Sequence, residues 1–161
     1  MSKLIATVFG IGYINPGSGT WGSLVALPFF WVIYQLVGVL GAVLVCAMLF
    51  YIGWKATEIH SNQTQTHDAS EIVIDEVVGQ FIALLPVALG AYMTRSPIEH
   101  LWPAWISAFL IFRGLDILKP GIIGSIDKDE TALSVMLDDV FAGFFAACGV
   151  CVLAGIFHVI S

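Results

Sequence analysis

Long apolar stretches separated by short polar segments dominate the pattern along the chain. Three of these stretches, 72–92, 101–118 and 135–160, reach the length of about 20 residues that a membrane-spanning helix needs. The first of them carries two adjacent acidic residues near its start, whereas ordinary spanning segments avoid charge. The pattern therefore predicts membrane helices, and it singles out the polar positions at their ends.

A fourth apolar stretch is too long for one crossing of a bilayer. Residues 21–54 form a 34-residue run without a charge. A single helix of that length would reach about 50 Å, whereas the hydrocarbon core is about 30 Å thick. We therefore predict a hairpin of two short helices, near 22–36 and 39–57, that turns at Gly38 and Gly41.

Composition supports the membrane interpretation. Hydrophobic residues make up 58% of the chain and charged residues 11%, and the mean hydropathy is +0.92. So few charges cannot cover the surface of a soluble globule, and such high hydrophobicity excludes disorder. We predict one domain, 1–161, with the all-α fold of a polytopic membrane bundle of about five membrane segments, and a short interfacial helix at 3–11. The net charge of −6 argues against nucleic acid as a partner.

Five segments place most of the charge on one side of the membrane. Segments 1–21, 55–71 and 119–134 then share a side, which collects every basic residue except Arg95. The positive-inside rule makes that side cytoplasmic. The same side also collects 11 of the 12 acidic residues, all but Glu99. We therefore expect the chemistry, and any active site, to face the cytoplasm.

The first polar segment on that side is rich in glycine. Five glycines fall within residues 10–23, directly before an apolar helix. Glycine lets backbone N–H groups, such as that of Gly19, converge on an anion at a helix N-terminus. Thr20 and Ser23 offer hydroxyl donors to a phosphate oxygen. Taken alone, the segment is equally typical of a flexible turn whose hydroxyls cap the helix.

The second polar segment leads into the apolar stretch 72–92. Asp68 and Glu71 have the spacing of an N-cap residue and its capping-box partner. Glu71, Asp75 and Gly79 would then lie along one stripe of the helix. Capping does not explain Asp75 and Glu76, which lie one turn inside an apolar span, where an unpaired carboxylate is costly. Intramembrane acids of this kind usually mark a functional site.

The third polar region joins two apolar helices. Arg113 and Asp116 are three residues apart on one helix face, with Lys119 near the same face. Asp138 and Asp139 repeat the arrangement of paired acids near the start of an apolar helix. The charged run 127–130 between these helices is more typical of a solvated loop.

The acids in these regions suggest a hard cation. Carboxylates that gather within a few ångströms either take up protons or bind a multivalent ion. Oxygen ligands without patterned His or Cys favour Mg²⁺, Mn²⁺ or Ca²⁺, and Mg²⁺ is often completed by a substrate phosphate. Together with a basic pair and a glycine-rich anion loop, this indicates phosphoryl chemistry on a lipid. The acids concerned are Asp75, Glu76, Asp116, Asp138 and Asp139.

Four sequence blocks resemble the signature blocks of the phosphatidylglycerophosphatase A family. They are GSGTWGSL (17–24), IVIDEVVGQ (72–80), FRGLDILKP (112–120) and MLDDVFAG (136–143). The resemblance implies an Mg²⁺-dependent, multi-pass enzyme of the bacterial inner membrane. Such an enzyme hydrolyses phosphatidylglycerophosphate to phosphatidylglycerol and inorganic phosphate, with membrane lipid as its surroundings.

The resemblance also implies roles for individual residues. The expected metal ligands are Asp75, Glu76, Asp138, Asp139 and Asp127. The expected substrate-binding residues are Gly19, Thr20, Ser23, Asp68, Arg113 and Lys119. The expected catalytic residues are Asp75, Asp116, Arg113 and Lys119. Attack on phosphorus by water and attack by a carboxylate, through an aspartyl-phosphate, both remain open.

One alternative from another class uses the same residue types. A membrane transporter or proton relay also employs intramembrane carboxylates, but it places them near the bilayer midplane. Here the acids lie near the predicted helix ends, which favours the enzyme. The sequence does not indicate an oligomeric state.

Overall fold

A computed structural model gives the fold and describes residues 1–64, 70–129 and 131–160. Every regular element of the described part is a helix, which confirms the all-α prediction. The short helices are α1 (Ser2–Ala6), η1 (Ile11–Tyr13), η2 (Ile98–Leu101) and α5 (Ile122–Asp127). The long ones are α2 (Ser18–Thr64), α3 (Ile74–Thr94), α4 (Trp102–Leu118) and α6 (Ala132–Ile160).

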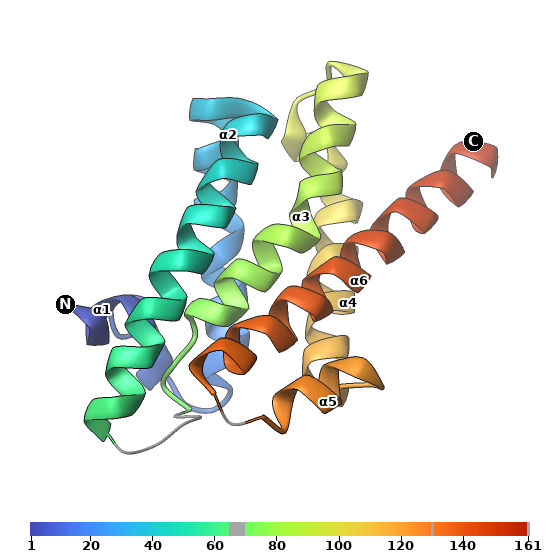
Figure 1. The fold of residues 1–161 in the computed structure, drawn as a ribbon. Coiled ribbons are helices and arrows are strands. Elements are labelled where there is room, and N and C mark those ends of the chain that lie inside the picture. Colours follow the sequence, from blue (N-terminus) through green and yellow to red (C-terminus); the bar gives the residue numbers. More distant parts are fainter. Residues whose placement is uncertain (65–69, 130, 161) are drawn as a thin grey trace.

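Helix α2 is a hairpin of two limbs, as predicted. Its backbone leaves the helical conformation at Gly38, where φ is 67° and ψ is −168°. Residues with a side chain rarely adopt such a positive φ, so glycine permits the reversal. Figure 1 shows the two limbs running side by side, with the turn at one end of the molecule and both Ser18 and Thr64 ends at the other. Gly41 lies within the second limb and not in the turn.

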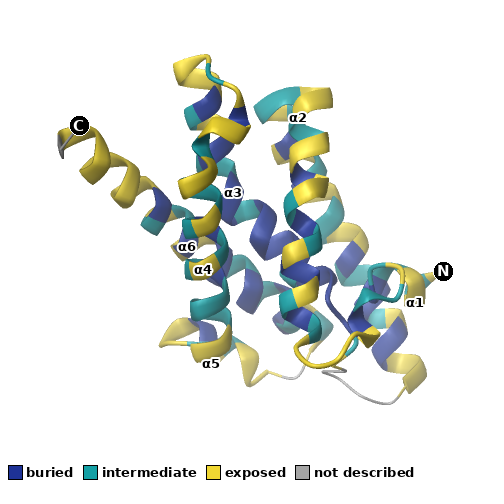
Figure 2. Cartoon of the chain, turned by 180° about the vertical axis from the view of Figure 1, so that it is seen from behind, coloured by how far each residue is buried: buried dark blue, intermediate teal, exposed yellow. Residues whose placement is uncertain are grey.

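Four helices in the described part of the chain are long and apolar enough to cross a membrane: α2, α3, α6 and the combined η2–α4 segment. Since α2 folds back on itself, these helices provide five limbs, in agreement with the predicted number. The C-terminal part of α6 diverges from the bundle, and its residues 151–159 are all exposed (Figures 1 and 2). Exposed apolar side chains are expected where lipid covers a helix.

Helix α3 lies at the centre of the bundle and packs against α2, α4 and α6. Its buried side chains include Phe81, whose ring meets that of Phe30 from α2 edge to face at 5.2 Å. Phe30 also contacts Trp105 of α4, with ring centroids 6.0 Å apart. These aromatic contacts join α2, α3 and α4.

Helices α3 and α6 approach most closely at two glycines. A Cβ atom on Gly143 would overlap the carbonyl oxygen of Gly79, and one on Gly79 would lie 2.6 Å from the carbonyl oxygen of Asp139. Only glycine allows two helix backbones to come this close. Asp75 and Asp139 each precede one of these glycines by four residues, so the crossing brings the two acids together.

The polar ends of the helices depart from the prediction in two places. The N-terminal helix ends at Ala6, well short of the predicted 3–11, and is followed by turns and η1. Helix α3 begins at Ile74 without a side-chain cap, so Glu71 is not part of the helix and the predicted capping box is wrong. Glu71 instead lies 3.4 Å from the buried ring of His60, and the backbone N–H of Val73 donates to the carbonyl of Ala6. These tertiary contacts hold residues 70–73 outside the helix, which begins only at Ile74.

Candidate active site

The three polar segments meet at the end of the bundle where α2 and α3 begin, α4 ends and α6 begins. A cavity of about 180 Å³ opens there, and its lining is mostly polar. Predicted site residues that line it are Asp75, Glu76, Asp116, Lys119, Asp127, Asp138 and Asp139. The structure therefore brings together acids that lie more than 60 positions apart in the sequence.

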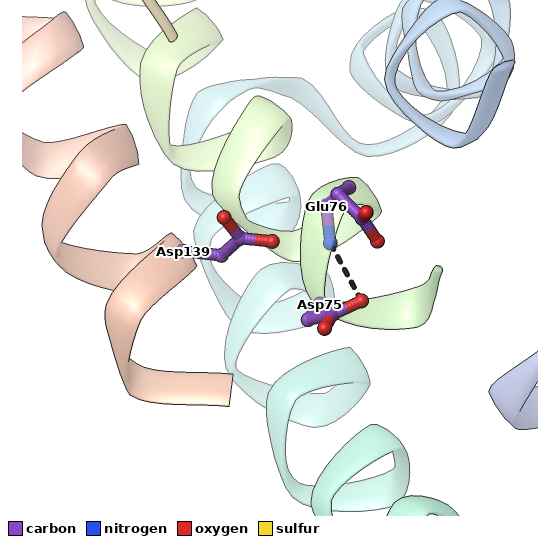
Figure 3. A group of neighbouring side chains, drawn as sticks. All are labelled: Asp75, Glu76 and Asp139. Atoms are coloured by element: carbon purple, nitrogen blue, oxygen red, sulfur yellow. Dashed lines mark hydrogen bonds between the residues drawn. The ribbon is translucent and has the colours of Figure 1, made fainter. Parts of the chain in front are cut away.

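Three of these acids form the tightest group. Asp75, Glu76 and Asp139 each place one carboxylate oxygen within 4.8 Å of the other two. Asp139 extends from α6 toward the first turn of α3, where the backbone N–H of Glu76 donates to Asp75 Oδ1 at 3.1 Å (Figure 3). Asp75 and Asp139 are 7% and 3% exposed, so water screens their mutual repulsion poorly.

The donor set fits a hard divalent cation. All of its ligand atoms are carboxylate oxygens, which Mg²⁺ and Ca²⁺ prefer over the N and S ligands typical of zinc. Glu76 Oε2 and Asp139 Oδ1 are buried and have no hydrogen-bond partner in the described part of the chain. Buried carboxylate oxygens are normally paired, and a cation bound among these acids would satisfy Asp139 Oδ1.

Lys119 contributes an ammonium group to the lining of the cavity. Its Nζ donates to Asp138 Oδ2 at 2.7 Å and also forms an ion pair with Asp127. Burial alone would lower the pKa of Lys119, but hydrogen bonds and charge from Asp127 and Asp138 outweigh it and raise the pKa above its ordinary value. Lys119 therefore carries its charge throughout the neutral pH range.

Asp127 and Asp138 thus face Lys119, outside the group formed by Asp75, Glu76 and Asp139. Asp127 is the last residue of α5 and stands at the rim of the cavity, with a side chain 38% exposed. Asp138 is 4% exposed, and its second oxygen accepts the backbone N–H of Asp139 at 3.0 Å. Their predicted role as metal ligands stays a prediction.

Arg113 and Asp116 form an ion pair on α4, as their spacing predicted. Both side chains are 13% exposed, and Arg113 Nε is buried without a partner in the described part of the chain. A Cβ atom on Gly19 would lie 3.0 Å from an Arg113 terminal nitrogen and would overlap Glu76 Oε1. The first turn of α2 is therefore packed against the Glu76 carboxylate and the Arg113 guanidinium. Anion binding by the backbone of Gly19, which is not among the described residues that line the cavity, stays a prediction.

The predicted hydroxyl donors are placed differently. The Ser23 hydroxyl is fully buried and donates to the carbonyl of Gly19 at 2.8 Å within α2. Thr20 and Ser23 are not among the residues that line the cavity in the described part of the chain. Asp68 lies outside the described residues. The role of all three in binding substrate stays a prediction.

The cavity is also lined by two serines that were not predicted from the sequence. The Ser18 hydroxyl donates to the carbonyl of Ser70 at 2.6 Å, which ties the start of α2 to the segment before α3. Ser18 stands beside Gly19 in the glycine-rich segment, so its position was a usable signal. Ser70 has no comparable signal, because its place at the cavity depends on the tertiary contacts of the non-helical segment 70–73.

Comparison with known proteins shows the family of the chain. The family model described as Phosphatidylglycerophosphatase A matches residues 4–154. This chain belongs to that family. It is similar to the phosphatidylglycerophosphatase A of Haemophilus influenzae, with 35% identity over 144 residues that cover 89% of this chain and 82% of the relative. It is also similar to that of Escherichia coli K12, with 31% identity over 153 residues, 89% of this chain and 78% of the relative.

A third relative carries a different name. A Bacteroides thetaiotaomicron protein, provisionally named a phosphatidylinositol-3-phosphatase, is 33% identical over 149 residues, 89% of this chain and 87% of the relative. No solved structure matches the chain. Membership of the phosphatidylglycerophosphatase A family makes the chain a phosphatase, and the cavity described above is its candidate active site.

Proposed function

We propose that the protein hydrolyses the terminal phosphomonoester of phosphatidylglycerophosphate in an Mg²⁺-dependent reaction, at the cytoplasmic face of the bacterial inner membrane. The observation that carries the proposal is the grouping of Asp75, Glu76 and Asp139 beside Lys119 and Arg113 at the end of an apolar bundle. A lipid in the bilayer would present its phosphate at this depth, where the helices begin and end. The names of two relatives support the choice of substrate.

Asp75, Glu76 and Asp139 are the residues that would hold the cation. Bound there, Mg²⁺ would neutralise the phosphate charge and make phosphorus more electrophilic. The buried oxygen Asp139 Oδ1, which lacks a partner in the described residues, supports this assignment.

The cations of the chain bind and orient the phosphate. Lys119 lines the cavity, and Arg113 stands behind the first turn of α2 with its Nε unused. An ammonium and a guanidinium on the non-bridging oxygens stabilise the charge that spreads over them during phosphoryl transfer. For Lys119 to bind substrate, the phosphate replaces Asp127 as its partner at the rim.

Asp116 is the group best placed to direct a water molecule. It lines the cavity, it is held by Arg113, and it lies close enough to Asp139 to interact with it electrostatically. Water attacks phosphorus in line with the bond to the glycerol oxygen, and it loses a proton to Asp116. The bond from phosphorus to the glycerol oxygen breaks, that oxygen takes up a proton from bulk water, and Asp116 returns its own proton to bulk water. The products are phosphatidylglycerol and inorganic phosphate.

The test is release of phosphate by detergent-purified protein from phosphatidylglycerophosphate, with Mg²⁺ present and then chelated. We expect turnover that chelation abolishes and added Mg²⁺ restores. Asp75→Asn should lower kcat by at least about a hundredfold, because one oxygen ligand loses its charge, while the protein stays folded. Asp129→Asn, at an exposed position outside the cavity lining, is the matched control and should leave the rate unchanged.

The outcomes separate the parts of the proposal. Faster release from phosphatidylinositol 3-phosphate than from phosphatidylglycerophosphate would overturn the substrate assignment and leave the phosphatase assignment intact. Full turnover in the presence of chelator would overturn the metal requirement. Near-normal turnover of Asp75→Asn would remove Asp75 from the site.

A further inference from the structure

Gln80 is a buried polar residue that the mechanism above does not use. It lies on α3, its side chain is 0% exposed, and neither its amide nitrogen nor its amide oxygen has a hydrogen-bond partner in the described residues. An unpaired buried amide destabilises a fold, and an apolar side chain of equal size would avoid that cost. A group kept at such a cost is a candidate for a role in function.

The position of Gln80 on the helix relates it to one acid of the site. Gln80 follows Glu76 by four residues, and residues four apart are neighbours on a helix face. Glu76 Oε2 is itself buried and lacks a partner in the described part of the chain. A carboxylate oxygen accepts hydrogen bonds, and the Gln80 amide nitrogen donates them, so the two unpaired groups are complementary.

We propose that Gln80 is a positioning residue for Glu76, whose amide donates to Glu76 Oε2, directly or through one buried water, when Glu76 holds a divalent cation. The inference rests on the proposed function, because it takes Glu76 as a metal ligand. A carboxylate that binds the cation through one oxygen leaves its second oxygen unpaired, and the group can then rotate away from the cation. A donor on that second oxygen fixes the carboxylate, and loss of such an outer partner typically weakens metal affinity or activity by about 10–100-fold.

The experiment uses Gln80→Met, which keeps the length of the side chain and removes its polar atoms. Binding of Mn²⁺ to the purified protein is followed by electron paramagnetic resonance, and thermal unfolding is measured with chelator and with Mg²⁺. Mn²⁺ binding should weaken about tenfold or more, and the Mg²⁺ concentration for half-maximal activity should rise in parallel. With chelator, the unfolding temperature should equal or exceed that of the wild type, because the unpaired amide is gone.

Leu84→Met is the matched control. Leu84 lies one further turn along the same stripe and is also 0% exposed, so the same residue is introduced at equal burial. Its Mn²⁺ affinity and Mg²⁺ response should match the wild type. If Leu84→Met weakens the cation as much as Gln80→Met, the effect comes from packing and the inference is wrong.

Other results would also overturn the inference. Unchanged Mn²⁺ affinity in Gln80→Met removes the link to Glu76. A fall of more than about 4 °C in the unfolding temperature with chelator means that the amide has a structural partner. Failure of the wild type to bind Mn²⁺ overturns the metal site and the inference together. Wild-type protein that binds Mn²⁺ but releases no phosphate from phosphatidylglycerophosphate contradicts only the proposed function, since the Mn²⁺ measurement still tests Gln80.

Discussion

Lys119 combines an unusual backbone with an unusual set of partners. It ends α4 in the left-handed conformation, with φ of 43°, and Pro120 follows it directly. From that position its side chain reaches two carboxylates, Asp127 and Asp138, from two other helices. A backbone held in a sparsely populated region is a common feature of functional sites. The helix end therefore serves to aim the ammonium into the cavity.

Replacement of Lys119 by Met should separate phosphate binding from metal binding. The variant keeps the apolar stem and loses the charge, so kcat/KM should fall by about 10–100-fold, the value of a hydrogen bond between charged groups. Mn²⁺ affinity should not fall, because removal of a cation leaves the cavity more negative. Phosphate release and Mn²⁺ binding would be measured on the same preparation.

The matched control is Lys128→Met, at an exposed position outside the cavity lining. It should leave both quantities unchanged. Because the pKa of Lys119 is raised, the ammonium persists to high pH and is lost only above that value. The wild-type rate should therefore show no decline due to Lys119 up to about pH 10, near the ordinary lysine pKa. Weakened Mn²⁺ binding in Lys119→Met would contradict the assigned role.

Local spacing predicted some side-chain partners and not others. Arg113 and Asp116 lie three residues apart on one helix, so their ion pair follows from helix geometry alone. The partners of Lys119 are 8 and 19 residues away and depend on how α5 and α6 return to the end of α4. For Ser23, the prediction overlooked a local partner. Its hydroxyl donates to a carbonyl within its own helix, and this hydrogen bond competes with any ligand.

The crossing of α3 and α6 determines the distance between the acids. The helices touch backbone to backbone at Gly79 and Gly143, and Asp75 and Asp139 stand one turn before the contact. A wider crossing would pull the carboxylates apart by the same amount. The two glycines are therefore part of the site, although neither offers a side chain.

Gly143→Ala should disrupt the site through this contact. The added methyl group overlaps the carbonyl oxygen of Gly79, and overpacking of this kind costs about 1–3 kcal/mol. We expect at least a tenfold loss of phosphatase activity, weaker Mn²⁺ binding and a lower unfolding temperature.

Gly155→Ala makes the same change on the same helix, where a Cβ atom meets nothing within 4 Å. It should retain wild-type activity and equal or better stability, since alanine favours a helix by about 1 kcal/mol over glycine. Equal activity of Gly143→Ala and Gly155→Ala would show that the close crossing is not required.

The limits of prediction from the sequence differ between helix interiors and helix ends. The long apolar stretches predicted α3, α4 and α6 to within three residues at each end, and the charge-free length of 21–54 predicted the reversal of α2. The capping box predicted at Asp68 and Glu71 would start α3 about five residues too early, because Glu71 pairs with His60 and the 70–73 segment is tied to α1 and α2. Those contacts join distant parts of the chain, and no local pattern reveals them.

The reversal at Gly38 also determines the sidedness of the molecule. With it, the glycine-rich segment, the end of α4, and α5 all lie at the same end of the bundle, as Figure 1 shows. Without it, the first turn of α2 could not meet Glu76 and Arg113. The arrangement of the site and the number of crossings therefore depend on one another.

Single-cysteine labelling tests this arrangement in the cell membrane. After replacement of Cys46, Cys148 and Cys151 by alanine, a cysteine is introduced at an exposed position of each polar end: Asn15→Cys, Ser125→Cys or Thr94→Cys. A membrane-impermeant maleimide should label the first two variants only in inside-out vesicles, and the third only in spheroplasts. Labelling of Asn15→Cys and Ser125→Cys from opposite sides would contradict a reversal within α2.

The tip of the α2 hairpin has a further consequence for biogenesis. Neither limb carries a charge from Trp21 through Trp54, and the reversal at Gly38 falls near the middle of that run. Transfer of ionic groups across a bilayer is costly, so an uncharged tip can cross at low cost. The two limbs can therefore insert together as a pair, because no charged loop between them has to cross the bilayer.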